Sequence, residues 1–233
     1  MLLDKLSLRN LRNIREANLQ LNNRTNVIIG ENAAGKTTLL EAIDILSRGR
    51  SFRTNKSEDL IQHGGTSLYI GGTLGESNKK LEIEKKQNKT KILVDGKEEN
   101  RQSRLAEQLA VQTIHPNSHG LIEGPPSERR AFIDWGLFHV EHSYKNEWSK
   151  YVKILRQRNE ALKMRDPEAD AWMKQLAPLG ERISLLRENY VEGLKKHIEE
   201  TQKLIMPDLE VVLAYEKGWE KEKPFIEALE SKK

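Results

Sequence analysis

The sequence contains no cysteine, which excludes a disulfide framework, a cysteine-ligated zinc site and a thiol nucleophile. No apolar run is long enough to span a bilayer. The first residues, MLLDKLSLRN, lack the apolar core and the small-residue cleavage site of a signal peptide. Internal repeats and low-complexity tracts do not stand out either. Together these absences predict a soluble, cytoplasmic protein.

The composition is polar for a globular protein. Hydrophobic residues make up 36% of the chain, charged residues 32%, and the mean hydropathy is −0.71. Such values favour a compact head with long, solvated helices over one compact ball. The net charge of +4 and the pI near 9.1 permit a nucleic-acid partner without arguing for one, because many soluble proteins carry a similar excess.

The first half of the chain alternates between strand and helix patterns. Residues 2–30 read as a β-hairpin, and from Lys36 the apolar residues recur at helical spacing until Gly49, a plausible stop. Residues 67–97 return to short alternating strands separated by polar turns. A short helix over 102–110 and a strand through AVQTI, at 110–114, are predicted to follow.

The second half reads as an antiparallel helical hairpin. A first helix has heptad spacing at Trp148, Val152, Leu155 and Leu162, with Asn159 at the remaining seam position. A second apolar series consists of Leu176, Leu179, Ile183, Leu186 and Tyr190. Asp166 and Pro167 suit the start of the second helix, which Pro178 should kink or restart. The segment from Met206 to Gly218 is predicted to return as a strand.

One loop carries a specific chemical signal. Residues 30–37, GENAAGKT, match G-x-x-x-x-G-K-[ST] at every fixed position, between a predicted β-branched strand and a predicted helix. Glycines allow the loop to wrap so that backbone amides converge on phosphates, and the helix directs its positive end at the anion. Lys36 adds a mobile charge, the Thr37 hydroxyl is the expected Mg²⁺ ligand, and Thr38 can reach the α-phosphate. The predicted nucleotide-binding loop comprises Gly30, Glu31, Asn32, Ala33, Ala34, Gly35, Lys36, Thr37 and Thr38.

Phosphate binding does not imply hydrolysis. A second, carboxylate-ended strand is normally needed to hold the metal and polarise water, and no run of four apolar residues followed by paired acids occurs. The nearest run, AFIDW at 131–135, follows a helix-start signal, so we interpret Asp134 as an aspartate on a helix. Gln112 ends the apolar run LAVQ and could reach a metal-bound water, or could be a solvated strand-end glutamine.

Several stretches together resemble the RecF family of recombination mediators, which belongs to the ABC-type ATPase heads. They are LRN at 11–13, GENAAGKTTLLEAI at 30–43, GRSFR at 49–53, GPPSERRAFIDWGLFH at 124–139, RQRNEAL at 156–162 and GWEKE at 218–222. The resemblance implies a mixed α/β (α+β) fold with a P-loop head, lobe I, and an inserted helical-hairpin arm, lobe II. Residues 1–125 would form the head, 126–205 the arm, and 206–233 the start of a return towards the remainder of the protein.

The same resemblance implies a function. RecF-like proteins bind ATP with Mg²⁺, dimerise head to head around it and recognise duplex DNA near gaps or single-strand junctions. They recruit RecR and, with RecO, help to load the recombinase. By position, Arg12 would approach the phosphates, Gln112 would be the Q-loop glutamine near the metal, and Arg50 and Arg53 would sense nucleotide or DNA or remain a solvated helix end. A cytoplasmic, nucleoid-associated protein is expected.

The chain also departs from the family pattern. The signature motif, the paired-aspartate strand and the D-loop of the family are missing from these residues, which suggests a fragment. We therefore expect the fragment to be monomeric and to have negligible hydrolysis, with the ATP-dependent homodimer confined to the full-length protein. Asn117 and Ser118 stand where the family usually has an acidic pair.

Two other functions remain as alternatives. One is a P-loop kinase or transporter-type ATPase, although an arginine-rich lid and a transporter signature are not evident. The other is an interaction module that uses the helical hairpin and holds nucleotide structurally. A lysine-rich stretch could form a sequence-neutral DNA-binding surface, but it is more often a solvated face. Its members are Lys79, Lys80, Lys85, Lys86, Lys89 and Lys91.

Overall fold

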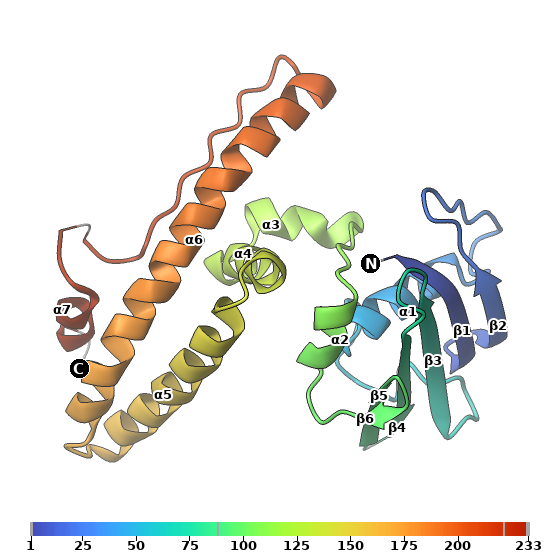
Figure 1. The fold of residues 1–233 in the computed structure, drawn as a ribbon, viewed down its shortest axis with the longest axis horizontal. Coiled ribbons are helices and arrows are strands. Elements are labelled where there is room, and N and C mark those ends of the chain that lie inside the picture. The colour runs from blue at the N-terminus through green and yellow to red at the C-terminus, as the bar shows by residue number, and fades with distance from the viewer. Residues whose placement is uncertain (1, 88, 221, 232–233) are drawn as a thin grey trace. The chain divides into compact units, whose positions relative to one another are not determined.

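The computed structural model describes residues 2–87, 89–220 and 222–231 and divides into two compact units, Met1–Pro116 and Asn117–Lys233 (Figure 1). The structure therefore divides between residues 116 and 117, whereas the sequence places the end of the head at residue 125. The assignment of head, arm and return to 1–125, 126–205 and 206–233 stays a prediction. Lys221, within GWEKE, lies outside the described residues.

The first unit is built on one antiparallel sheet with the strand order β2-β1-β3-β4-β5-β6. The predicted strands over 67–97 are confirmed, and the last turn suits its residues because Asp95 and Gly96 adopt φ values of 50° and 75°. The strands are β1 (Leu3–Leu11), β2 (Ile14–Gln20), β3 (Ser67–Leu74), β4 (Lys80–Lys86), β5 (Lys89–Val94) and β6 (Lys97–Glu98).

Helix α1 (Lys36–Arg48) packs on one face of this sheet. The predicted start at Lys36 and stop at Gly49 are both confirmed, because Gly49 closes the helix with φ 71° and donates its N–H to Ile45. Gly72 of β3 allows the close approach, since a Cβ there would lie 2.3 Å from Leu46 Cδ2. Helix α2 (Ser103–Gln108) matches the short helix predicted over 102–110 and adds Leu105 to the same core.

The predicted strand that precedes the phosphate loop is wrong. The hairpin closes early, with β2 ending at Gln20, and residues 21–30 form no strand. Val27 and Ile29 are 76% and 89% exposed. Alternating apolar residues become a strand only where a neighbouring strand accepts their backbone hydrogen bonds, and none of the described strands pairs with this segment.

The strand predicted through AVQTI is also absent. Residues 109–115 form neither a helix nor a strand, and side chains of α1 hold them in place. Arg48 donates to the carbonyl oxygen of Val111 at 3.2 Å, and the Thr113 hydroxyl donates to Asp44 Oδ1 at 3.0 Å. Side-chain hydrogen bonds with α1 thus replace the strand pairing that the apolar pattern predicts.

The second unit is helical. After a 3-10 turn at Pro116–His119, its helices are α3 (Gly120–Glu123), α4 (Pro126–Val140), α5 (Tyr144–Met164), α6 (Ala169–Ile205) and α7 (Phe225–Glu230). Helices α5 and α6 form the predicted hairpin (Figure 1). Asp134 lies on α4, as interpreted from the sequence, and its carboxylate binds Arg187 and the hydroxyl of Tyr144. The side chain of Asn117 lies outside the described residues.

Two expectations for this unit need correction. Helix α6 passes through Pro178 without interruption, so the proline does not restart the helix. The segment from Met206 to Gly218 forms no strand but runs back along α6, where Tyr215 and Ser184 share a hydroxyl hydrogen bond of 3.1 Å (Figure 1). Most side chains of this segment are exposed, Val212 by 81%, so it lacks the buried face of a strand.

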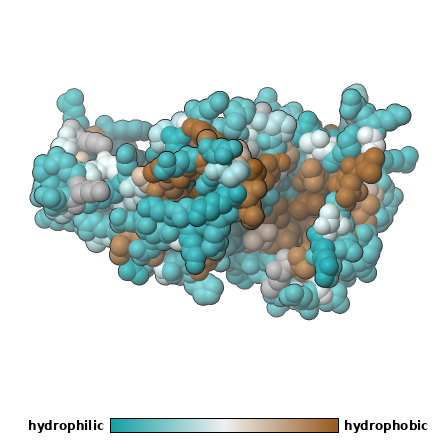
Figure 2. Space-filling model, turned by 90° about the horizontal axis from the view of Figure 1, so that it is seen from above, coloured by the Kyte–Doolittle hydropathy of each residue, from teal (hydrophilic) through white to brown (hydrophobic). Residues whose placement is uncertain are grey.

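The surface reflects the polar composition. Figure 2 shows a largely hydrophilic face interrupted by hydrophobic areas. The most exposed large apolar side chains of the described residues include Val27, Ile29, Ile114, Ile122, Leu204 and Val212. Among the helices of the described residues, none is both long enough and apolar enough to cross a membrane.

Candidate nucleotide-binding site

The loop between Gly30 and Lys36 has the backbone that a phosphate cradle requires. Ala33 and Gly35 adopt positive φ values of 64° and 97°, and Gly35 is the residue that precedes the first turn of α1. A Cβ at Gly35 would lie 3.2 Å from the Ile14 side chain, so both conformation and space favour glycine here. The amide groups of the first turn of α1 are therefore directed at the loop.

Lys36 folds back over this loop. Its ammonium group donates to the carbonyl oxygens of Gly30 at 2.8 Å and Glu31 at 2.7 Å. Two carbonyl oxygens and a flexible four-carbon stem position the charge above the wrapped backbone. The structure thus brings the cation and the N-terminal end of α1 to the same loop.

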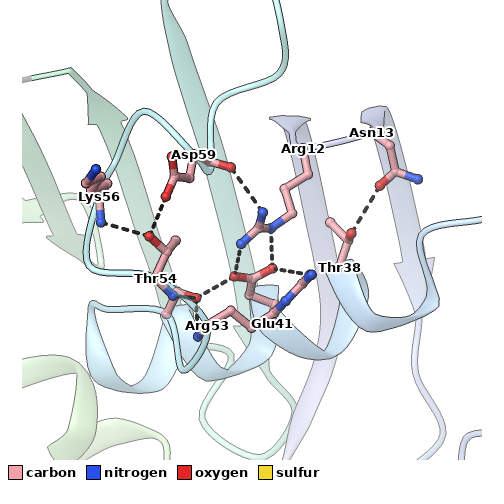
Figure 3. Close-up of polar contacts among 9 residues, drawn as sticks. Arg12, Asn13, Thr38, Glu41, Arg53, Thr54, Lys56 and Asp59 are labelled. Carbon is pink, nitrogen blue, oxygen red and sulfur yellow. Dashed lines mark hydrogen bonds and ion pairs between the residues drawn. The ribbon is translucent and has the colours of Figure 1, made fainter. Parts of the chain in front are cut away.

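Asn13, in the turn between β1 and β2, ties the loop to the helix, and Figure 3 shows its bond to Thr38. Its amide group donates to the carbonyl oxygen of Ala33 at 2.7 Å, and its amide oxygen accepts the hydroxyl of Thr38 at 3.0 Å. Both hydrogen-bonding ends of one side chain are therefore used to fix the spacing between the loop and the first turn of α1. The sequence assigned no role to Asn13.

Glu41, one turn further along α1, is a fully buried carboxylate that binds Arg12 (Figure 3). Arg12 Nε donates to Glu41 Oε2 at 2.5 Å and Nη2 donates to Oε1 at 2.8 Å, a bidentate pairing. Arg12 Nη1 also donates to the carbonyl oxygen of Asp59 at 3.2 Å. The arginine predicted to approach the phosphates thus pairs with the phosphate-loop helix itself.

The segment after α1 converges on the same carboxylate. The hydroxyl of Ser51 donates to Glu41 Oε1, and Arg53 Nη1 lies 3.3 Å from Glu41 Oε2. The Ser51 hydroxyl also accepts the backbone N–H of Arg53 at 2.9 Å, which shapes the turn that carries this arginine. Glu41 therefore joins two arginines that lie far apart in the sequence.

The charge state of Glu41 follows from these partners. Burial alone raises the pKa of the carboxyl group, but hydrogen bonds from Arg12 and Ser51, with the charges of Arg12 and Arg53, hold the pKa below its ordinary value. The hydrogen bond with Glu41 in turn raises the pKa of Arg12. The carboxylate is thus ionised at neutral pH and serves as a fixed negative charge under the loop.

The remaining predicted site residues are exposed. Thr37, Arg50 and Gln112 all face solvent, and the amide group of Gln112 donates only weakly to Thr113 O, at 3.4 Å. Within residues 2–87, 89–220 and 222–231, no group of three or more His, Asp or Glu side chains forms a metal cluster. The roles of Thr37 and Gln112 at a metal, and of Arg50 and Arg53 at DNA, stay predictions.

One lysine of the lysine-rich stretch 79–91 is not on the surface. Lys85 is buried, because it follows Leu81 and Ile83 on the inward face of β4, and its ammonium group donates to the carbonyl oxygen of Gly49 at 2.8 Å. Burial lowers the pKa of Lys85. This lysine stabilises the C-terminal end of α1, where a positive charge is favourable, and takes no part in a DNA-binding surface.

The sequence contains a signal for Glu41 that the motif obscured. Glu41 immediately precedes Ala42, and Asp44 immediately precedes Ile45. Ala42 and Ile45 lie on the face of α1 that packs on the sheet, so the two acidic side chains lie next to the core. A charged residue at such a position requires a partner of opposite charge. For Asn13 no comparable signal exists, because its contacts depend on how the hairpin turn meets the loop.

Comparisons with known proteins agree with this geometry. A family model described as an AAA ATPase domain matches residues 1–206. The DNA replication and repair protein RecF of Enterobacter sp. (strain 638) is 36% identical over 235 residues, which cover 99% of this chain and 66% of that protein. RecF of Vibrio cholerae serotype O1 is 34% identical over 98% of this chain and 66% of its own length. The chain thus spans about two thirds of the length of these relatives.

Solved structures give the same result. A structure of the recombination mediator protein RecF-ATP in the RecFOR pathway covers 99% of this chain and 66% of its own, with a TM-score of 0.83 and 28% identity. A second structure, of RecF-ATPrS, covers 88% of this chain and 58% of its own, with a TM-score of 0.77 and 30% identity. On the family model, the relatives and the fold together, the chain belongs to the RecF family of AAA-type ATPases.

Proposed function

We propose that this chain is the nucleotide-binding part of an ATP-dependent DNA-repair protein of the RecF type. The observation that carries the proposal is the loop at the N-terminus of α1, where Lys36 lies over a wrapped backbone and Gly35 has a positive φ of 97°. A helix N-terminus with a glycine-shaped loop and a lysine is a site for the phosphates of a nucleotide. The relatives named with ATP support the choice of ATP.

The proposed site extends beyond the loop. Gly30 to Thr38 would bind the phosphates, the exposed hydroxyl of Thr37 would ligate Mg²⁺, and Gln112 would reach a metal-bound water. Mg²⁺ suits this arrangement because it takes oxygen ligands and keeps several waters. Arg12, on the adjacent turn, would contact a phosphate by leaving Glu41. That this chain does not hydrolyse ATP stays a prediction.

The proposed partners follow from the family. They are duplex DNA at gaps and single-strand to double-strand junctions, RecR and, indirectly, RecO, and a second copy in an ATP-dependent dimer of the longer protein. Arg50 and Arg53 are the proposed DNA contacts from the head. Support for these partners comes from the names of the relatives, which describe a DNA repair protein and the RecFOR pathway.

Calorimetric titration with Mg-ATP tests the nucleotide proposal. The unmodified chain and Lys97→Ala, which removes an exposed lysine of the same unit, should bind. Lys36→Ala should lose about 100-fold or more in affinity, because a charge-assisted contact with phosphate disappears. Circular dichroism should show the same fold in all three proteins. Absence of binding to the folded, unmodified chain would contradict the proposal.

A further inference from the structure

Glu41 attracts more positive charge than one carboxylate can pair. Two arginines and a serine hydroxyl converge on its two oxygens, and the carboxylate has no exposure to solvent (Figure 3). One arginine is sufficient to neutralise the buried charge. The second arginine is therefore in excess at this site.

The two arginines hold the carboxylate unequally. Arg12 binds both oxygens, at 2.5 and 2.8 Å, whereas Arg53 reaches only Oε2, at 3.3 Å. That oxygen is the one that Arg12 Nε already occupies. The Arg12 side chain is 21% exposed and the Arg53 side chain 43% exposed, so Arg53 is the weaker and more solvated partner.

The arginines also belong to different parts of the head. Arg12 adjoins Asn13, which contacts both the loop and α1, so Arg12 lies next to the proposed phosphate site. Arg53 belongs to residues 50–59, which Ser51 attaches to Glu41 at one end and Asp59 attaches to Arg12 at the other. A change in the pairing of Glu41 would therefore alter the contacts at both ends of the segment 50–59.

We propose that Glu41 is a positioning residue, a shared counter-ion for which Arg12 and Arg53 compete. When a nucleotide phosphate attracts Arg12, Arg53 takes both oxygens of Glu41 and draws the segment 50–59 onto α1. The physical cause is the high free-energy cost of an unpaired buried carboxylate, which makes a replacement cation necessary. The role of the phosphate in this exchange rests on the proposed function, whereas the competition itself does not.

A double-mutant cycle in the absence of nucleotide tests the competition. Arg53→Gln should change the unfolding equilibrium little in the unmodified chain, because Arg12 already pairs with Glu41. In an Arg12→Gln background, Arg53→Gln should raise the equilibrium constant of unfolding about tenfold more, because Arg53 is then the remaining cation at Glu41. The cycle is measured by urea unfolding followed by far-ultraviolet circular dichroism, because the tryptophans all lie in the second unit.

Two further backgrounds make the cycle specific. In Glu41→Gln the coupling should vanish, while in Asp44→Asn, which alters the other buried carboxylate of α1, the coupling should persist. Additive effects of the two arginine changes in the unmodified chain would overturn the competition. Coupling that persists in Glu41→Gln would overturn the role of Glu41.

Amide hydrogen exchange over residues 50–59 tests the link to nucleotide. Saturating Mg-ATP should slow exchange there about tenfold or more in the unmodified chain and in Asp44→Asn, but not in Glu41→Gln. A bound nucleotide that leaves exchange over 50–59 unchanged would overturn the link. If Mg-ATP does not bind at all, the proposed function fails, and the nucleotide-free cycle still decides whether the arginines share Glu41.

Discussion

At the scale of single residues, Glu41 and Asp44 are both buried on α1, yet their pKa values shift in opposite directions. Two arginines and a serine hydroxyl hold the pKa of Glu41 below 4.5. Burial raises the pKa of Asp44 above 3.8, and Arg48 and the Thr113 hydroxyl offset this only in part. The difference lies in the number of donors that reach each carboxylate.

These opposite shifts predict opposite pH dependences. A lowered folded pKa gives Glu41 a stabilising contribution that is present above pH 4.5 and lost as the pH falls through the folded pKa. A raised folded pKa gives Asp44 a contribution that is present below pH 3.8 and lost as the pH rises through the folded pKa. Glu41→Gln should cost about 3 kcal/mol near neutral pH, and its deficit should shrink as the pH falls below 4.5.

Urea unfolding at several pH values measures both variants. Relative to the unmodified chain, Asp44→Asn should become less favourable as the pH falls, whereas Glu41→Gln should become more favourable. The opposite signs serve as the internal control, since a general acid effect would move both variants the same way. A parallel response of the two variants would contradict the assigned partners.

At the scale of elements, helix α6 is longer than its local sequence predicts. The helix continues for 37 residues although Pro178 lacks an N–H group and crowds the preceding turn. Its apolar residues explain this, because they are buried on both sides of the proline. Met173, Leu176 and Ala177 pack against α5 and α7 before it, and Ile183 and Leu186 pack against α4 and α5 after it. Tertiary packing outweighs the local preference to end the helix.

Removing that local conflict should stabilise the arm. Pro178 is exposed, so Pro178→Ala loses no packing and should raise the free energy of unfolding by up to about 3 kcal/mol. Gly193→Ala, at an open position of the same helix, is the matched control and should add about 1 kcal/mol from propensity alone. Urea unfolding followed by far-ultraviolet circular dichroism compares them. A neutral or destabilising Pro178→Ala would show that the proline is required for the packing.

At the scale of the whole molecule, a net charge of +4 is too small to define a DNA-binding surface by itself. The lysine-rich hairpin contributes less than its sequence suggests, because Lys85 is buried and Lys79 bonds to Gln108. Of the two proposed DNA contacts that follow α1, Arg50 is exposed, whereas Arg53 also pairs with Glu41. The proposed DNA binding should therefore depend on few phosphate contacts.

Salt titration of DNA binding tests this expectation. Fluorescence anisotropy with a gapped duplex should show affinity that falls as salt rises from about 50 to 200 mM, because each phosphate contact releases a counter-ion. Arg50→Gln should reduce the slope of log K against log salt by about 1, and Lys97→Gln, elsewhere on the head, should leave it unchanged. A slope that both variants leave unchanged would exclude Arg50 as a contact.

The sequence by itself determined the features that depend on neighbouring residues. The loop at 30–37, the start of α1 at Lys36, its stop at Gly49 and the α5–α6 hairpin are all set by local spacing, caps and periodicity. Their hydrogen bonds close within a few residues, or their apolar faces repeat at a fixed period. Such features can be predicted from short stretches of the sequence.

The tertiary structure decided the features that need a distant partner. Residues 27–30 have the composition of a strand, but no described strand pairs with them, and AVQTI is bound to side chains of α1 instead. Likewise, Arg12 and Arg53 both bind Glu41, across 29 and 12 residues of chain. Pairing, burial and shared counter-ions depend on which segments meet, and no local pattern in the sequence specifies that meeting.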